Sequence, residues 1–176
     1  MIIAVTYLGS EAEAISHYAE FLAIPSLMQD VKARPYPELN EMLNGQAEYG
    51  YRRVMKGSSF LPPLTVDYAE SLFDDLLDFH KRVPDAANSA ILLEWINPRK
   101  NMLVGQRDTA FPNRGKLLNF AIGTTWTDPA NDTVCREWAR EMGAKGRREV
   151  EKSQRGDDVD AVTKEGSAEY VNYDCE

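Results

Sequence analysis

Apolar side chains recur along this chain with two periods, and the periods predict helices alternating with strands. After Pro62-Pro63 a helical stripe holds Ala69, Leu72, Phe73, Leu76, Leu77, His80 and Val83. Residues 117–126 instead alternate as a strand does, with one face made of Leu118, Phe120, Ile122, Thr124 and Trp126. Asp128-Pro129 then predicts the start of a second helix, whose buried edge is Val134, Trp138 and Met142.

Weaker patterns fill the rest of the chain. Residues 2–8 predict a strand, and Ser10 with Glu13 forms a capping-box signature for a short amphipathic helix. Three prolines make residues 23–44 an irregular connection with one short helix at 38–43. Further strands are expected at 49–57, 89–96 and, less clearly marked, 103–106.

The order of these elements predicts the fold class. Strand, helix, strand occurs twice, with further strands after each, which favours an α+β fold: an antiparallel sheet covered on one face by helices. A ferredoxin-like arrangement is the nearest simple description. We expect one domain over residues 1–143. Apolar periodicity then disappears, so residues 144–169 are expected to be a polar flexible insertion or linker.

Composition and charge narrow the partners. With 43% hydrophobic and 27% charged residues the chain should fold, and its formal net charge is −8. No stretch gathers the lysines and arginines that phosphate backbones or anionic lipids attract, so neither nucleic acid nor a membrane surface is expected as a partner. The apolar opening at 1–8 is too short to span a bilayer and lacks the features of a signal peptide.

The inventory of reactive side chains excludes several chemistries. The chain holds two cysteines, Cys135 and Cys175, far apart, and two histidines, His17 and His80, so no metal site and no Ser/His or Cys/His nucleophile is expected. Cys135 is expected to be an inert buried thiol. The glycines form neither a GxGxxG nor a P-loop spacing, so the chain has no visible pyrophosphate cradle.

After these exclusions, the closing segment Tyr170-Val171-Asn172-Tyr173 is the remaining candidate for a chemical role. On a strand, Tyr170 and Asn172 would share a face and Tyr173 would turn to the other. By pattern alone this is also what an edge strand with aromatic packing looks like.

This segment resembles the Tyr-x-Asn-Tyr signature near the end of berberine bridge enzyme-like FAD-linked oxidoreductases, flavoproteins of the PCMH type. Other pieces of the chain resemble the fungal branch of that family in the expected order: Tyr49-Gly50-Tyr51-Arg52-Arg53, Lys56-Gly57, the 89–95 strand, Thr109-Ala110-Phe111-Pro112-Asn113-Arg114, Trp126-x-Asp128 and Trp138-Ala139-Arg140. Members are often secreted.

The resemblance implies the second, substrate-binding domain of a two-domain enzyme. In the family a first domain holds the FAD, and the antiparallel sheet of the second covers the reactive face of the flavin. By this resemblance Tyr173 is the general base that takes a proton from the substrate, and Asn172 and Tyr170 lie against the flavin. The substrate would be an alcohol, a sugar or a secondary metabolite, with O2 as electron acceptor.

Two further residues are candidate substrate contacts. Arg114 would pair with a carboxylate or with the flavin edge, although relatives usually have His where this chain has Asn113. Asn119 lies where some relatives carry an acidic or amide residue facing the substrate, and a solvated outward strand position explains it equally well. Glu94 is interpreted as a polar residue on a strand face rather than an acid catalyst.

Two alternatives stay open. The FAD-binding domain and the usual continuation after Tyr173 are not in the sequence, so residues 170–176 are expected to be the start of a truncated C-terminal segment, and the chain a fragment that is inactive alone. Alternatively, the chain is a stand-alone module that binds a small apolar ligand in an aromatic cleft near Tyr36, Tyr49 and Tyr51.

Overall fold

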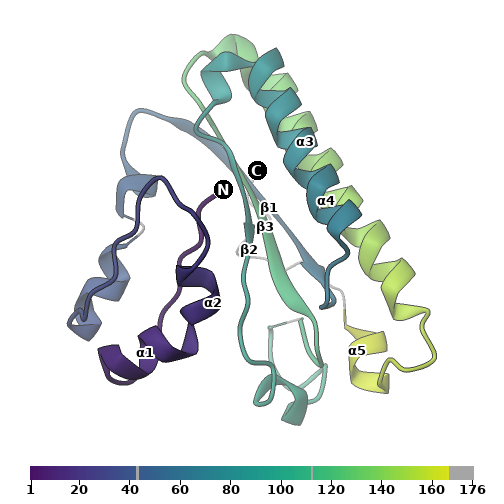
Figure 1. Ribbon diagram of the computed structural model, residues 1–176. Helices are drawn as coiled ribbons and strands as arrows, with labels where there is room; N and C mark the ends of the chain where they lie inside the picture. Colours follow the sequence, from purple (N-terminus) through teal and green to yellow (C-terminus); the bar gives the residue numbers. More distant parts are fainter. Residues whose placement is uncertain (43, 112, 167–176) are drawn as a thin grey trace. The chain divides into compact units, whose positions relative to one another are not determined.

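The computed structural model describes residues 1–42, 44–111 and 113–166, and divides the chain into two compact units (Figure 1). The first unit is Met1–Tyr49 and the second begins at Gly50. The boundary predicted after residue 143 falls instead inside a helix of the second unit.

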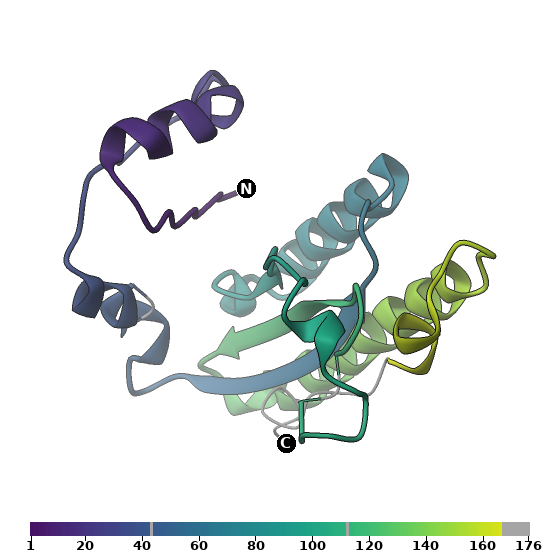
Figure 2. The same ribbon diagram turned by 90° about the horizontal axis from the view of Figure 1, so that it is seen from below.

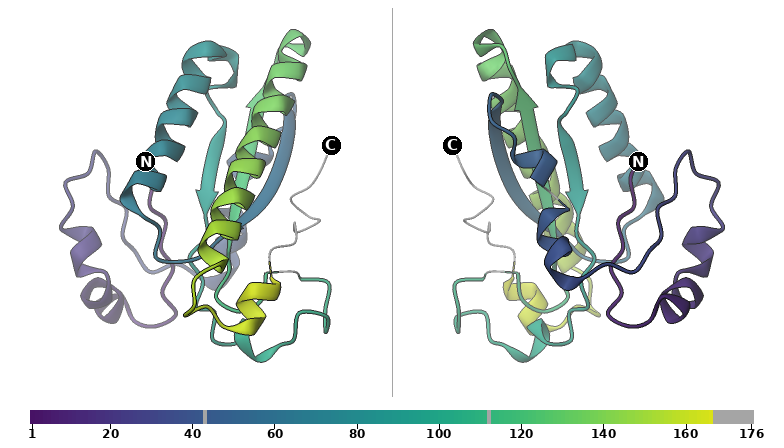
Figure 3. Two further views of the ribbon diagram at one scale, coloured as in Figure 1. Left: turned by 90° about the vertical axis from the view of Figure 1, so that its right-hand side faces the viewer. Right: turned by 90° about the vertical axis from the view of Figure 1, so that its left-hand side faces the viewer.

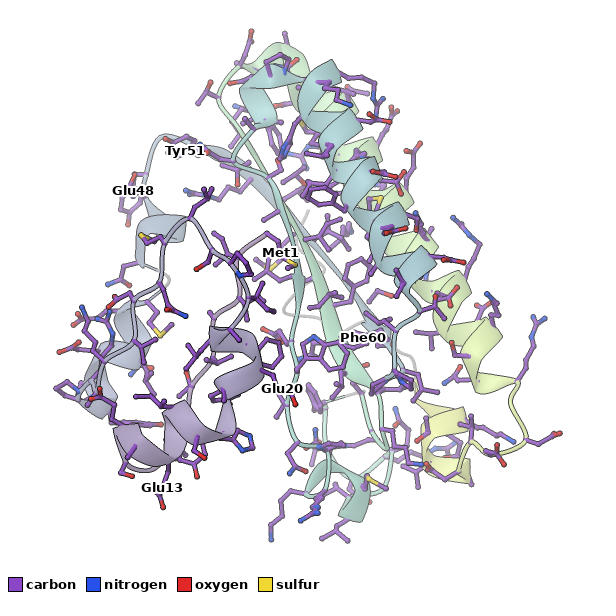
Figure 4. The ribbon with its side chains drawn as sticks, in the orientation of Figure 1. Met1, Glu13, Glu20, Glu48, Tyr51 and Phe60 are labelled. Carbon is purple, nitrogen blue, oxygen red and sulfur yellow. The ribbon has the colours of Figure 1, made fainter. Side chains whose placement is uncertain are left out.

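The first unit consists of short helices and connecting segments. They are α1 (Glu11–His17), α2 (Ala19–Leu22) and two 3-10 helices, η1 (Tyr36–Glu41) and η2 (Asn44–Ala47). The predicted capping box is confirmed: the Ser10 hydroxyl accepts from the Glu13 N–H at 3.3 Å, and the Glu13 carboxylate accepts from the Ser10 N–H at 2.9 Å. Glu13, labelled in Figure 4, lies at this end of α1. The strand predicted at 2–8 is wrong, because no other strand pairs with these residues.

The second unit is α+β and is built on a three-stranded antiparallel sheet. Its strands are β1 (Arg52–Phe60), β2 (Ala90–Leu93) and β3 (Leu118–Trp126), in the order β1-β3-β2. β3 is therefore central: Phe60 of β1 lies opposite Leu118, and Leu93 of β2 lies opposite Phe120. The predicted strands at 49–57, 89–96 and 117–126 are confirmed, with shifted ends.

Two long helices, α3 (Val66–Arg82) and α4 (Asp132–Gln154), cover one face of this sheet, as the sequence predicted. The left view of Figure 3 shows both in front of the strands. Between them and the sheet lies the core, in which the ring of Phe79 stacks on that of Trp138 with centroids 4.1 Å apart. Phe60, labelled in Figure 4, contributes to the same core from the end of β1.

The predicted apolar stripe of α3 is partly correct. Leu72 and Val83 are buried, but Phe73 and Leu77 are exposed, and Phe79, which the stripe left out, is fully buried. Thr65 caps the helix, its side chain accepting from the N–H of Tyr68 at 3.3 Å. Asp128 caps the short 3-10 helix η5 (Pro129–Asn131), which leads into α4.

The linker predicted from residue 144 is helical in its first part, because α4 continues to Gln154. In and beside this part, the buried positions of α4 are Gly143, just before it, and Gly146 and Val150 within it. Because two of these three residues are glycines, the buried side of the helix shows almost no hydrophobic pattern in the sequence. A Cβ on Gly146 would lie 2.6 Å from the Ser58 hydroxyl and 2.7 Å from a ring carbon of Phe120, so only glycine lets α4 approach the sheet this closely.

Residues 94–117 connect β2 to β3 through an irregular segment. The strand predicted at 103–106 is wrong: residues 101–103 form a 3-10 helix, η4 (Asn101–Leu103), closed by backbone bonds such as Met102 N–H to the Pro98 carbonyl at 2.9 Å. Another 3-10 helix, η3 (Pro84–Ala86), follows α3. Among the described residues, no helix has the length and apolar content needed to cross a bilayer.

Candidate functional site

The sheet presents two different faces. Val54, Ser58, Phe120 and Ile122 point to the helices, whereas the alternate positions of the same strands form the opposite face. The register brings these alternate positions together as Met55, Gly123 and Ala90 in one row, Gly57, Ala121 and Leu92 in the next, and Ser59, Asn119 and Glu94 in the last. This second face is made mostly of small residues and ends in a polar row, and neither α3 nor α4 covers it.

The polar row belongs to a chain of hydrogen bonds. The Nδ2 of Asn113 donates to the Oδ1 of Asn119 at 2.7 Å, and the Nδ2 of Asn119 donates to the Oε2 of Glu94 at 2.8 Å. An ionised carboxylate can only accept, so Glu94 sets the orientation of the Asn119 amide, and Asn119 sets that of Asn113. Among the described residues the Oδ1 of Asn113 has no hydrogen-bond partner, although Asn113 is only 1% exposed.

Arg114 follows Asn113 and is also buried, at 5% exposure. Its guanidinium donates to the hydroxyl of Thr109 and lies over the ring of Phe111, 5.3 Å from the centroid. Its Nε is buried and has no hydrogen-bond partner in the part of the chain that the structure describes. Asn113 and Arg114, which are neighbours in the sequence, thus carry one acceptor and one donor that no described residue pairs.

The turn that carries these residues is fixed by α5 (Ala161–Glu165). The backbone N–H of Lys116 donates to the Thr163 hydroxyl at 2.9 Å, and Gln154 at the end of α4 donates to the Thr163 carbonyl at 2.7 Å. Gly115 has φ +67, and a Cβ there would lie 2.7 Å from the Thr163 N. Figure 2 shows α5 beside this turn, so the end of α4 and α5 hold Asn113 and Arg114 in place.

Of the two predicted substrate contacts, Asn119 bonds the side chain of Asn113, the residue that precedes Arg114, and Arg114 itself contacts Thr109 and Phe111. Asn119 is 8% exposed, so it is not a solvated outward position. The sequence pattern did not predict that Glu94 belongs to this cluster. Predicting it would have required the register of the strands at 89–96 and 117–126, because that register sets Glu94 beside Asn119.

The predicted residues Tyr170, Asn172 and Tyr173 lie outside the described residues. Of the aromatic-cleft residues, Tyr36 and Tyr49 belong to the first unit and Tyr51 to the second.

Other ionised groups of the second unit join its elements. Asp132 accepts two bonds from Arg52, at 2.5 and 2.6 Å, and one from the Trp126 indole at 2.8 Å, and these bonds lower the pKa of its carboxyl. Asp85 accepts from Thr127, Asp128 and Asn131, and its pKa is held far below the ordinary value. These carboxylates tie β1, η3 and α4 to the end of β3. No group of three or more metal-binding side chains occurs among the described residues.

Comparison with known proteins finds similarity to an FAD-linked oxidoreductase. No family model matches the chain, and no solved structure matches it. The chain is similar to the FAD-linked oxidoreductase hasG of Aspergillus fumigatus, with 26% identity over 145 residues that cover 77% of this chain and 31% of the relative. It therefore spans about a third of the length of that protein. Over most of its own length, the chain is similar to part of an FAD-linked oxidoreductase.

Proposed function

We propose that this chain is the substrate-binding portion of an FAD-dependent oxidoreductase of the berberine bridge enzyme-like, PCMH-type group. Its partners would be a small-molecule substrate and an FAD-binding domain. The similarity to an FAD-linked oxidoreductase supports the redox class. The order β1–α3–β2–β3–α4 supports a ferredoxin-like substrate domain, since these are the first five elements of that arrangement.

The observation that carries the proposal is the sheet face that α3 and α4 leave uncovered. Its middle rows consist of Gly57 and Ala121, which are buried, Ala90 and Gly123, which are half-buried, and the longer side chains of Met55 and Leu92, which are each 38% exposed. A Cβ on Gly123 would have no neighbour nearer than 4.0 Å. A flat, largely apolar ring such as a flavin fits a surface of this kind, and the Asn119 row at its end supplies polar contacts.

FAD bound there would supply a hydride acceptor that O2 can reoxidise. The chain's own residues would bind and orient the substrate and move its proton. Asn119, held by Glu94 and Asn113, would present a fixed amide, and Arg114 a fixed cation. Tyr173 would accept the proton of the substrate hydroxyl, with Asn172 and Tyr170 against the flavin.

The position of α5 is consistent with these roles. Its C-cap Gly166 packs on the backbone of Arg114, where an added Cβ would lie 3.3 Å from the Arg114 carbonyl oxygen. Tyr173 comes seven positions after Gly166 in the sequence, and a chain of seven residues spans at most about 25 Å. The chain length after α5 therefore allows the proposed role of Tyr173.

The test is to produce the chain together with the FAD-binding domain that the proposal requires, and to follow flavin reduction without oxygen by a panel of alcohols and sugars. With a substrate that reduces the flavin, Tyr173→Phe should slow reduction by about 10²- to 10⁴-fold, the usual contribution of a general base. Tyr68→Phe, on α3 away from the cluster, is the matched control.

Two results would contradict the proposal. If the assembled protein bound no FAD, the redox function would be wrong, and the stand-alone binding module would be the better description. If flavin reduction proceeded equally fast with Tyr173→Phe, the function could stand, but the base would be another group.

A further inference from the structure

Arg114 is a buried cation that pairs with no carboxylate among the described residues. Two partly buried cations of the second unit do have carboxylate partners: Arg52 pairs with Asp132 and Lys145 with Asp75, each at 2.5 Å. Arg114 is more deeply buried than either, yet it makes no ion pair with any residue that the structure describes. Taking a guanidinium out of water costs several kcal/mol, and a hydroxyl and an aromatic face offset only part of that.

The side-chain amides of Asn113 and Asn119 determine which groups of a ligand could bind here. Because Glu94 is an acceptor at one end of the chain of amides, each Asn directs its Nδ2 toward Glu94, and the Oδ1 of Asn113 is the end that remains. The unmatched groups are therefore the Nε–H of Arg114, which needs an oxygen to accept it, and the Oδ1 of Asn113, which needs a donor. Each is a desolvated polar atom, and the chain is less stable if nothing pairs with it.

We propose that Arg114 binds a carboxylate of the substrate, and that the substrate is a small-molecule acid that also carries a hydroxyl donor for Asn113. This inference rests on the proposed function and names its substrate class. A carboxylate satisfies the guanidinium in charge and geometry. The hydroxyl that donates to Asn113 is a different one from the hydroxyl whose proton Tyr173 would take, because a hydroxyl has a single donor proton. Glu94 and Asn119 act on this part of the site as positioning residues, because their hydrogen bonds set the orientation of Asn113.

The test reads the Arg114 side chain directly. The Nε–H of arginines gives separate signals in a 15N-correlated NMR spectrum, and Arg114→Lys identifies the Arg114 signal by its loss. The chain is titrated with sodium acetate and sodium glycolate, with acetamide as the neutral isostere and sodium chloride at equal ionic strength as the control. Arg107, an exposed arginine seven positions earlier, is the internal reference.

A saturable shift of the Arg114 signal with acetate, larger than that of Arg107 and absent with acetamide and chloride, is the expected result. Glycolate should in addition shift the side-chain amide of Asn113. The inference is overturned if Arg114 responds no more than Arg107, or if acetamide acts as acetate does. It is also overturned if lumiflavin shifts the signal and acetate does not, since Arg114 would then contact the flavin.

These outcomes separate the inference from the proposed function. The titration needs neither bound FAD nor Tyr173, so a failed redox assay leaves the Arg114 result unchanged. Conversely, the flavin could be reduced by neutral alcohols only, with no shift of the Arg114 signal on addition of acetate. That result would support the redox function and contradict the acidic substrate.

Discussion

The amides of Asn113 and Asn119 are joined by a buried hydrogen bond of 2.7 Å across the turn that enters β3. The Asn119 side chain is the middle of the chain of bonds, since it also donates to Glu94. Removing the Asn119 amide would break its bonds to Asn113 and to Glu94 at once, and would leave the Asn113 Nδ2 buried without a partner.

Asn119→Ala is therefore expected to lower the free energy of unfolding by about 1–3 kcal/mol, the cost of leaving a buried polar group unsatisfied. Urea unfolding followed by circular dichroism measures this change. Asn88→Ala, at an exposed turn, is the control and should stay within about 0.5 kcal/mol of the parent. Equal stability of the two variants would show that the Asn119 bonds contribute nothing net.

The two buried glycines of α4 should respond oppositely to alanine. At Gly146 the new methyl group would meet Ser58 and Phe120 at 2.6 and 2.7 Å, whereas at Gly143 its nearest neighbours are 3.8 Å away. Gly146→Ala should thus destabilise the chain by about 1–3 kcal/mol through overpacking. Gly143→Ala should stabilise it by up to about 1 kcal/mol through helix propensity. The urea concentration at the midpoint of unfolding, measured for the parent and both variants, tests these two changes. If Gly146→Ala stabilised the chain, α4 could not approach the sheet as closely as the structure shows.

Asp85 should contribute to the pH dependence of stability at acid pH. Hydrogen bonds from Thr127, Asp128 and Asn131 lower its pKa in the folded chain. A carboxyl with a lowered folded pKa stabilises the fold above its unfolded pKa of about 3.9, and this contribution is lost as the pH falls through the folded value. The melting temperature of the parent chain should therefore fall when the pH is lowered below about 4.

The variant Asp85→Asn should have a lower melting temperature than the parent at pH 7, and its melting temperature should fall less at acid pH. Asp78→Asn, an exposed change on α3, is the control, and an Asp85→Asn profile parallel to that of the parent would exclude Asp85 as the cause.

Cys135 should be chemically silent in the folded chain. Its side chain is fully buried, and burial together with the charges of Asp85 and Asp132 raises its pKa to about 11. The thiolate is the reactive form, so at pH 8 a Cys175→Ser variant should react very slowly with a disulfide reagent and rapidly once denatured. Fast reaction of the folded variant would mean that the α4 packing opens readily.

The sequence predicted those parts of the fold in which a regular hydrophobic period meets a clear start signal. The segments that became α3 and β3 combine both, and Ser10 with Glu13 marks the start of α1. It failed where packing is made by residues without hydrophobic character, as at Gly143 and Gly146, and where an apolar run such as 2–8 has no strand to pair with. In the site, Arg114 and Asn119 were predicted by resemblance. Their connection through Asn113 and Glu94 depends on the pairing of β2 with β3, which no local pattern reveals.

The central place of β3 also sets the order in which the fold can form. β1 and β2 do not pair with each other, and each pairs only with β3, the last strand along the described chain. A nascent chain that has reached β2 therefore holds two strands and one amphipathic helix but no sheet. Only when the residues up to Trp126 have been synthesised can both strands find their partner, and the Asn119 row then forms in the same event as the core. The site and the sheet thus share one long-range folding step, and a chain that ends before β3 would have neither.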